Sequence, residues 1–200
     1  MALVCAGCLS MSLSVSAAAK LEVDDERWLS IGAGARLDYK STENGAPDGN
    51  SRSNDFDVSS IRLYINGQLH ENLQFTINTE EIDNSIGVLD AILRFEPGPG
   101  FNIWAGKMLT PADRIEMNGP YYALSWNQYT QPLYPSDQGG QAGRLGRDEG
   151  ITVWGAAGKF QYAVGVFDGL DGLSNTGDDP LFAGRFAYNF LNMEKNPGYY

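Results

Sequence analysis

The residue types that carry most enzymatic chemistry are scarce in this chain. His70 is the only histidine, and Cys5 and Cys8 are the only cysteines. An activated serine or cysteine needs a neighbouring base, and a zinc site usually needs several imidazole or thiolate ligands. The carboxylate pairs Glu80-Glu81 and Asp178-Asp179 have no adjacent apolar pocket that would suit them to acid–base catalysis. We therefore expect no catalytic residue, no metal ligand and no cofactor.

A different group of charged residues could act on solutes without catalysis. A water-filled constriction selects solutes through its width and the charges that line it. The candidates for such a lining are Arg62, Arg94, Lys107, Arg114, Arg144, Arg147, Asp148 and Arg185. We expect their cations to form a positive stripe, which Asp113, Glu116, Asp148 and Glu149 offset in part. Two structural roles remain open: an Arg147–Asp148 ion pair that fixes a loop, and cross-strand pairs for Arg62 and Arg185.

The elements that must position these residues are strands. Side chains alternate between apolar and polar in eight runs, which is typical of strands with one apolar face. The runs are Trp28–Tyr39, Phe56–Leu69, Leu73–Glu81, Gly87–Phe95, Phe101–Met108, Gly150–Ala156, Lys159–Phe167 and Leu181–Phe190. The fourth and fifth runs alternate least regularly. With 24 glycines and 12% aromatic residues, the composition also favours an all-β fold.

The connections between these runs alternate in length. Those after the odd-numbered runs are Lys40–Asp55, Ile82–Ile86, Leu109–Glu149 and Asp168–Pro180, and those after the even-numbered runs are His70–Asn72, Glu96–Gly100, Ala157–Gly158 and Leu191–Pro197. In every pair but the second, the odd connection is clearly longer. Short turns at one end and long loops at the other are typical of transmembrane β-barrels.

Alternation alone does not separate a barrel from a soluble β-sandwich, which turns its apolar face inward. Several runs reach the roughly 9–11 residues that a tilted strand needs to cross a bilayer. Aromatic residues flank the short turns, as at Phe95 and Phe101, and the polar face carries arginines and amides in mid-strand. We therefore expect an antiparallel transmembrane β-barrel, with a secreted carbohydrate-binding sandwich as the alternative.

The start of the chain has the character of an export signal. Residues 2–19 are uncharged and partly apolar, and Ala17-Ala18-Ala19 precedes Lys20 as a small-residue cleavage site would. We assign residues 1–19 to a signal peptide and residues 20–200 to the N-terminal part of one barrel domain. The net charge of −11 argues against a nucleic-acid partner, which needs a basic face.

The longest connection, Leu109–Glu149, is rich in residues that order a loop. It holds Pro111, Pro120, Pro132, Pro135, Tyr121, Tyr122, Trp126, Tyr129 and Tyr134. Long loops in compact proteins are usually functional. As the third loop at the long-loop end, this insert is expected to fold inward, at about residues 109–149. At the C-terminus, Asn196-Pro197-Gly198 is a turn signal, and Tyr199-Tyr200 resembles the start of a ninth strand.

Short motifs in this order resemble a known family. Gly106–Pro111 and Gly146–Gly150 are similar to the segments that bound the third loop in the phosphate-selective porin O and P family, and Gly165–Gly169 and Gly184–Asn189 are similar to its later strand ends. The likeness runs from about Phe56 to Tyr200. It implies an outer-membrane barrel of sixteen strands, of which about eight are present, usually assembled as a homotrimer in a Gram-negative bacterium.

These observations together predict an outer-membrane porin for passive diffusion of small inorganic or organic ions. In characterised members of the family, phosphate selectivity relies on a loop and lumen rich in lysine. Here the insert has no lysine, and it contains three arginines and five acidic residues. We therefore expect a general or mixed anion pore, open to anions such as phosphate, rather than a phosphate-specific one. A barrel with a structural or adhesive role and no conducting pore is a further alternative.

Overall fold

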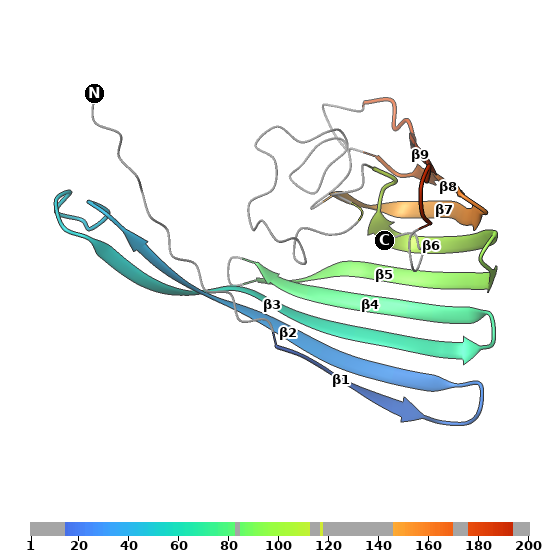
Figure 1. Ribbon diagram of the computed structural model, residues 1–200, viewed down its shortest axis with the longest axis horizontal. Coiled ribbons are helices and arrows are strands. Elements are labelled where there is room, and N and C mark those ends of the chain that lie inside the picture. The colour runs from blue at the N-terminus through green and yellow to red at the C-terminus, as the bar shows by residue number, and fades with distance from the viewer. Residues whose placement is uncertain (1–14, 83–84, 113–116, 118–145, 170–175, 194–200) are drawn as a thin grey trace.

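The described part of the chain forms one large antiparallel sheet. A computed structural model describes residues 15–82, 85–112, 117, 146–169 and 176–193. In this part of the chain nine strands lie side by side in sequence order, each paired with its neighbours along the chain (Figure 1). They are β1 (Val15–Glu22), β2 (Trp28–Thr42), β3 (Ser53–His70), β4 (Leu73–Ile82), β5 (Ser85–Gly98), β6 (Phe101–Leu109), β7 (Arg147–Ala157), β8 (Phe160–Phe167) and β9 (Leu181–Tyr188). The all-β, antiparallel prediction is confirmed. Among the described residues the sheet is open, with β1 and β9 at its two edges.

All eight expected strands are present, as β2 to β9, but several of them have different ends. β3 begins at Ser53 rather than Phe56, β7 begins at Arg147 rather than Gly150, and β9 ends at Tyr188 rather than Phe190. Strand β1 was not expected. It pairs with β2 from Val15↔Ala35 to Glu22↔Trp28, and so overlaps the segment assigned to the signal peptide. Cleavage after Ala19 would leave Lys20–Glu22 of this strand.

The longest hairpin extends beyond its neighbours. Residues Ser53–Ser60 of β3 pair with β2, whereas the pairing of β3 with β4 starts only at Ile61↔Glu81. Figure 1 shows this part of β2 and β3 projecting from the sheet as a two-stranded ribbon. At the base of the ribbon the register shifts between Arg36 and Leu37, which marks a β-bulge. A bulge bends its strand and increases the local twist, which accounts for the change in direction of the ribbon at this point.

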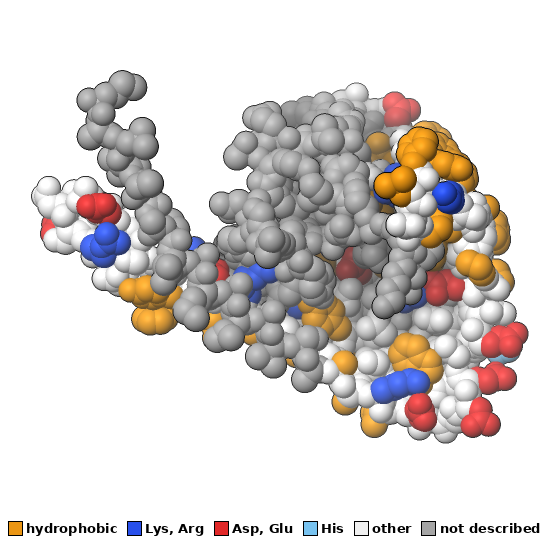
Figure 2. Space-filling view, viewed as in Figure 1, with side chains coloured by type: hydrophobic (Ala, Val, Ile, Leu, Met, Phe, Trp, Pro, Cys, Tyr) orange, Lys and Arg blue, Asp and Glu red, His pale blue; other side chains and the backbone are white. Residues whose placement is uncertain are grey.

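One face of the sheet is apolar and exposed. We call it the apolar face; its large members include Ile31, Leu37, Val58, Ile61, Leu63, Ile77, Leu93, Phe95, Ile151, Val164, Val166, Phe182, Phe186 and Tyr188, each at least 38% exposed. Directly paired residues point to the same side of a sheet, and the register joins Ile61 to Ala35 and Phe186 to Tyr162. Figure 2 shows hydrophobic side chains gathered over β8 and β9.

The other face carries most of the polar side chains and is largely buried. We call it the polar face; it includes Arg36, Asp38, Ser60, Thr76, Glu80, Asp90, Asn102, Thr152 and Gln161, none of them more than 8% exposed. Water-soluble domains show the reverse distribution, because burial of apolar groups drives their folding. This inversion is the most informative property of the sheet.

Part of the polar face is occupied by an apolar cluster. Its buried members are Ile92, Trp104, Met108, Met117, Ala163 and Phe167. Met117 belongs to the expected insert, and it is 1% exposed. A described residue of the insert therefore packs against the polar-face side of β5, β6 and β8. Most of the insert lies outside the described residues.

The point where the insert leaves and rejoins the sheet is closed by backbone contacts. Leu109 pairs with Arg147, and the backbone N–H of Thr110 donates to the carbonyl of Gly146 at 3.1 Å. In β6, the strand that precedes the insert, Gly106 has a φ of +128°, and a Cβ there would collide with the carbonyl oxygen of Ala91. Only glycine fits this close approach of β6 to β5. Within the described residues there is no helix of the length and apolarity that a membrane crossing requires.

Candidate functional site: ion pairs on the polar face

The candidate site is a band of charged and amide side chains on the polar face of β3 to β7. Strand alternation sends every second residue to this face, so Arg62, Asn66, Thr76, Asn78 and Arg94 come together from three strands. Neighbouring strands lie about 4.8 Å apart, within reach of arginine and glutamate side chains. The band therefore connects residues that are distant in sequence.

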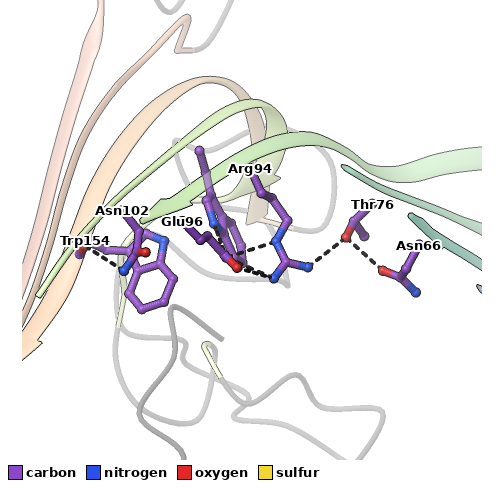
Figure 3. Close-up of polar contacts among 7 residues, drawn as sticks. Asn66, Thr76, Arg94, Glu96, Asn102 and Trp154 are labelled. Carbon is purple, nitrogen blue, oxygen red and sulfur yellow. Dashed lines mark hydrogen bonds and ion pairs between the residues drawn. The ribbon is translucent and has the colours of Figure 1, made fainter. Parts of the chain in front are cut away.

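Arg94 is the centre of the most connected group (Figure 3). Its Nε and Nη2 donate to the carboxylate of Glu96 at 2.9–3.1 Å, and its Nη1 donates to Oγ1 of Thr76 at 3.2 Å. The hydroxyl of Thr76 in turn donates to Oδ1 of Asn66 at 2.8 Å. Bidentate arginine–carboxylate contacts are among the strongest charge-assisted hydrogen bonds. They fix the guanidinium group against the sheet.

An indole stacks on this ion pair. The guanidinium carbon of Arg94 lies 4.9 Å from the centroid of the Trp104 ring, and Nε1 of Trp104 donates to Glu96 at 2.8 Å. Trp104 meets Trp154 edge to face, with the ring centroids 5.6 Å apart. Figure 3 shows Asn102 beside Trp154, where the amide donates to the Trp154 carbonyl. The aromatic rings thus close one end of the polar network.

A second ion pair joins β3 to β4. Nε of Arg62 donates to Oε1 of Glu80 at 2.8 Å, and the hydroxyl of Ser60 donates to the same oxygen at 2.7 Å. Arg62 and Glu80 are direct partners in the register, and their side chains are 12% and 9% exposed. The expectation of a cross-strand pair for Arg62 is therefore confirmed.

A third ion pair crosses from β7 to β5. Nε of Arg147 lies 3.2 Å from Oδ1 of Asp90, and the side chains are 7% and 3% exposed. The other oxygen of Asp90 accepts from the amide of Asn78 at 2.8 Å. Asp148, the residue expected to pair with Arg147, accepts from the backbone N–H groups of Glu149 and Gly169. Arg147 thus joins its strand to a carboxylate 57 residues earlier in the chain.

The structure brings together some of the predicted lining residues and separates others. Arg62, Arg94 and Arg147 lie in the polar band, and Arg185 pairs with Ala163 on the same face. Lys107 pairs in register with Ala91 and binds Glu149 at 2.9 Å, so alternation places it on the apolar face. Arg114 and Arg144 lie outside the described residues.

The described arginines do not form the expected positive stripe. Arg62, Arg94 and Arg147 each contact a carboxylate, and Arg36 and Arg185 also have interaction partners. The missed residues are those carboxylates: Glu80, Asp90 and Glu96. Alternation within the run Leu73–Glu81 indicates the polar face for Glu80, whereas Glu96 lies in an expected turn that the structure includes in β5.

The described part of the chain contains no group of three or more histidine, cysteine, aspartate or glutamate side chains arranged to hold a metal ion. The arrangement places hydrogen-bonded dipoles and paired charges close together on one side of the sheet.

Comparisons with models of known families, with curated proteins and with solved structures found no match to this chain.

Proposed function

We propose that this chain forms part of the wall of an outer-membrane β-barrel through which small solutes diffuse passively. The observation that carries the proposal is the inverted sheet, whose apolar face is exposed while its polar face is buried. Contiguous exposed apolar surface of this extent marks contact with lipid or with a partner. A barrel wall needs this distribution, with hydrocarbon outside and water inside.

The distribution of charge over the apolar face supports the same proposal. Its described charged residues Glu81, Lys107 and Glu149 lie toward the long-linker ends of their strands. Between them and the short turns the face is apolar or small. Burying a charge at the bilayer midplane costs roughly 2–4 kcal/mol in a barrel, and much less near the interfaces. Charges confined to an end therefore fit a membrane-spanning strand.

The secreted sandwich is less well supported. A sandwich would cover the apolar face with a second sheet, and the nine strands of the described residues all belong to one sheet. Aromatic side chains near the short turns, including Phe95, Phe101, Phe160 and Tyr188, fit an interfacial girdle. The short-turn end also carries acidic side chains, visible in Figure 2, as a water-facing end would.

The finer features of the proposal rest on the family resemblance. An open sheet edge is not tolerated in lipid, because unpaired backbone groups there cost several kcal/mol each. We infer that further strands close the sheet, as half of a sixteen-stranded barrel would require, and that three barrels associate. Residues 1–19 would direct export and then be removed.

A second candidate function has one observation in its favour. The apolar cluster around Met108, Met117 and Phe167 fills part of the polar-face side. Small structural barrels fill their interiors with side chains and conduct nothing. A structural or adhesive barrel is therefore the alternative to test.

Two measurements on the full-length gene product distinguish these functions. A barrel is expected to need detergent for extraction and to migrate faster in gels before boiling than after it; a monodisperse preparation without detergent would contradict membrane insertion. Single-channel current in a planar bilayer then separates a porin from a filled barrel. Discrete conductance steps are expected, and their absence from a correctly folded preparation would favour the structural barrel.

A further inference from the structure

The polar band presents its charges as closed pairs. Arg62 with Glu80, Arg94 with Glu96, and Arg147 with Asp90 are separated by 2.8, 2.9 and 3.2 Å. In every pair both side chains are no more than 23% exposed. Each pair therefore carries no net charge and is held close to the sheet.

The acidic member of each pair also accepts a hydrogen bond from a neutral donor. Glu80 binds the hydroxyl of Ser60, Asp90 the amide of Asn78, and Glu96 the indole of Trp104. The carboxylates are thus fixed from two sides. A diffusing anion would have to replace a bound carboxylate before it could contact the guanidinium groups, and in the Arg94 pair that contact is bidentate.

Paired charges act over a shorter range than isolated ones. The fields of the two members largely cancel at distances greater than their separation, and salt screens what remains with a Debye length of about 8 Å. A stripe of unpaired arginines would attract anions along the whole pore, whereas this band offers local dipoles. Such a lining interacts with polar solutes of either charge sign and with uncharged ones.

We propose that the channel selects weakly by charge and admits small polar solutes, uncharged and zwitterionic ones included, instead of concentrating anions such as phosphate. The inference rests on the proposed channel function and concerns its solute class. The specificity-determining residues are the carboxylates Glu80, Asp90 and Glu96, because they cancel the charge of the arginines.

The test is a double-mutant cycle on one pair, read out by the reversal potential of the full-length protein in a tenfold KCl gradient. We expect the unchanged protein to have a potassium-to-chloride permeability ratio between roughly one third and three. Glu96→Gln leaves the charge of Arg94 uncompensated and should shift the ratio toward chloride by about threefold or more, whereas Arg94→Gln should shift it toward potassium by a similar factor. The double variant should return to the starting ratio.

A matched control uses two adjacent glutamates on opposite faces of β4. Glu80→Gln removes an acid from the polar face and should shift the ratio toward chloride. Glu81→Gln removes an acid from the apolar face and should leave the ratio unchanged. Heat-modifiable migration reports whether each variant is folded, and the Arg62–Glu80 cycle replaces the Arg94–Glu96 cycle if those variants fail to fold.

The possible failures are distinguishable. Strong selectivity of the unchanged protein for either ion would overturn this inference and leave the channel intact. Single variants that leave the ratio unchanged would also overturn it, because the pairs would then lie away from the path of the ions. Absence of conductance from a folded preparation would overturn the proposed function itself, and this inference with it.

Discussion

Asp90 receives hydrogen bonds on both of its carboxylate oxygens, from Arg147 on one side and Asn78 on the other. Both members of the Arg147–Asp90 pair are almost fully buried. A buried ion pair contributes little net stability when compared with apolar residues, because desolvation of the charges offsets their attraction. Loss of one member is far more costly, since the remaining charge then stays buried without its main counter-charge.

Asp90→Ala is therefore expected to destabilise the fold strongly, by about 3–5 kcal/mol. This change is measured by unfolding the protein in urea, with the loss of the fast-migrating folded band in gels as the readout. Glu149→Ala serves as the control. It removes the carboxylate that pairs with Lys107, and the Glu149 side chain is 61% exposed. Exposed pairs contribute only about 0–1 kcal/mol. Equal effects of the two substitutions would show that the Arg147–Asp90 contact is not a buried one.

Asp48 lies outside the sheet, in the connection between β2 and β3. Its carboxylate accepts hydrogen bonds from the hydroxyl and backbone N–H of Ser51 and from the backbone N–H of Asn50. The hydroxyl of Ser51 makes the largest contribution, and together these donors lower the pKa of Asp48 to about 2. A carboxylate with a depressed pKa favours the folded turn above the ordinary pKa near 3.9, and that contribution is lost as the pH falls toward 2.

Titration of the Asp48 carboxyl by NMR is expected to give a midpoint near 2. Ser51→Ala should move the midpoint upward toward the ordinary value, because it removes the largest of these contributions. A midpoint near 3.9 in the unchanged protein would mean that this turn is not formed in solution.

At the scale of single elements, the close contact between β5 and β6 depends on one glycine. Gly106 combines a positive φ with a direct approach to the carbonyl of Ala91. Gly106→Ala is expected to lower the free energy of unfolding by about 1–3 kcal/mol, because the added Cβ forces both strands to move. Gly98→Ala, at the end of β5, is the matched control.

A Cβ at Gly98 meets no atom within 4 Å, so this second substitution should be nearly neutral. Urea unfolding of both variants, compared with the unchanged protein, provides the measurement. If Gly106→Ala unfolds at the same urea concentration as Gly98→Ala, the close approach of β6 to β5 is not present in the folded protein.

The elements also show how much of the structure could be predicted from sequence. Alternation found β2 to β9, and in β2, β3, β4 and β8 it also separated the two faces, because a strand with one apolar side and one polar side has a period of two. In β5 and β6 the alternation was less regular. It missed β1, where alanines carry no face signal and match an export segment equally well. Lys107 was expected among the lining residues because it lies at the base of the insert, although its partners Ala91 and Glu149 put it on the apolar face.

The cross-strand pair of Arg62 could be expected from the sequence, but the Arg147–Asp90 ion pair could not, for a different reason. Arg147 and Asp90 come from strands separated by β6, so their contact depends on the register of two strand pairs at once. Elsewhere in the sheet, bulges at Arg36/Leu37 and Asn78/Thr79 shift the β2–β3 and β4–β5 registers by a residue, and no glycine or proline lies at either shift to indicate it. Positive charges could be read from the sequence, but not the carboxylates that neutralise them.

At the scale of the whole molecule, the proposal depends on which face meets lipid. Leu63 and its neighbour Arg62 lie on opposite faces of β3, and Leu63 is 40% exposed. Leu63→Arg is expected to reduce stability in vesicles by about 2–4 kcal/mol, because it would place a charge in the hydrocarbon region. The fraction of folded protein at increasing urea concentrations measures this effect.

Tyr64→Arg is the control on the polar face, and it should cost clearly less because that side is proposed to meet water. A larger penalty for Tyr64→Arg than for Leu63→Arg would reverse the assignment of the two faces. It would therefore contradict the proposed orientation of the sheet in the membrane, whatever the conductance of the protein.

The projecting ribbon of β2 and β3 has a consequence for the dynamics of these two strands. Two strands without further neighbours are only marginally stable in water, and residues Ser53–Ser60 are paired with β2 as their single described partner. Amide hydrogens should therefore exchange with deuterium rapidly beyond the bulge at Arg36 and slowly before it, along one continuous strand. Fast opening at this tip would also make it the first site of cleavage by an added protease, while the remainder of the same strand stays intact.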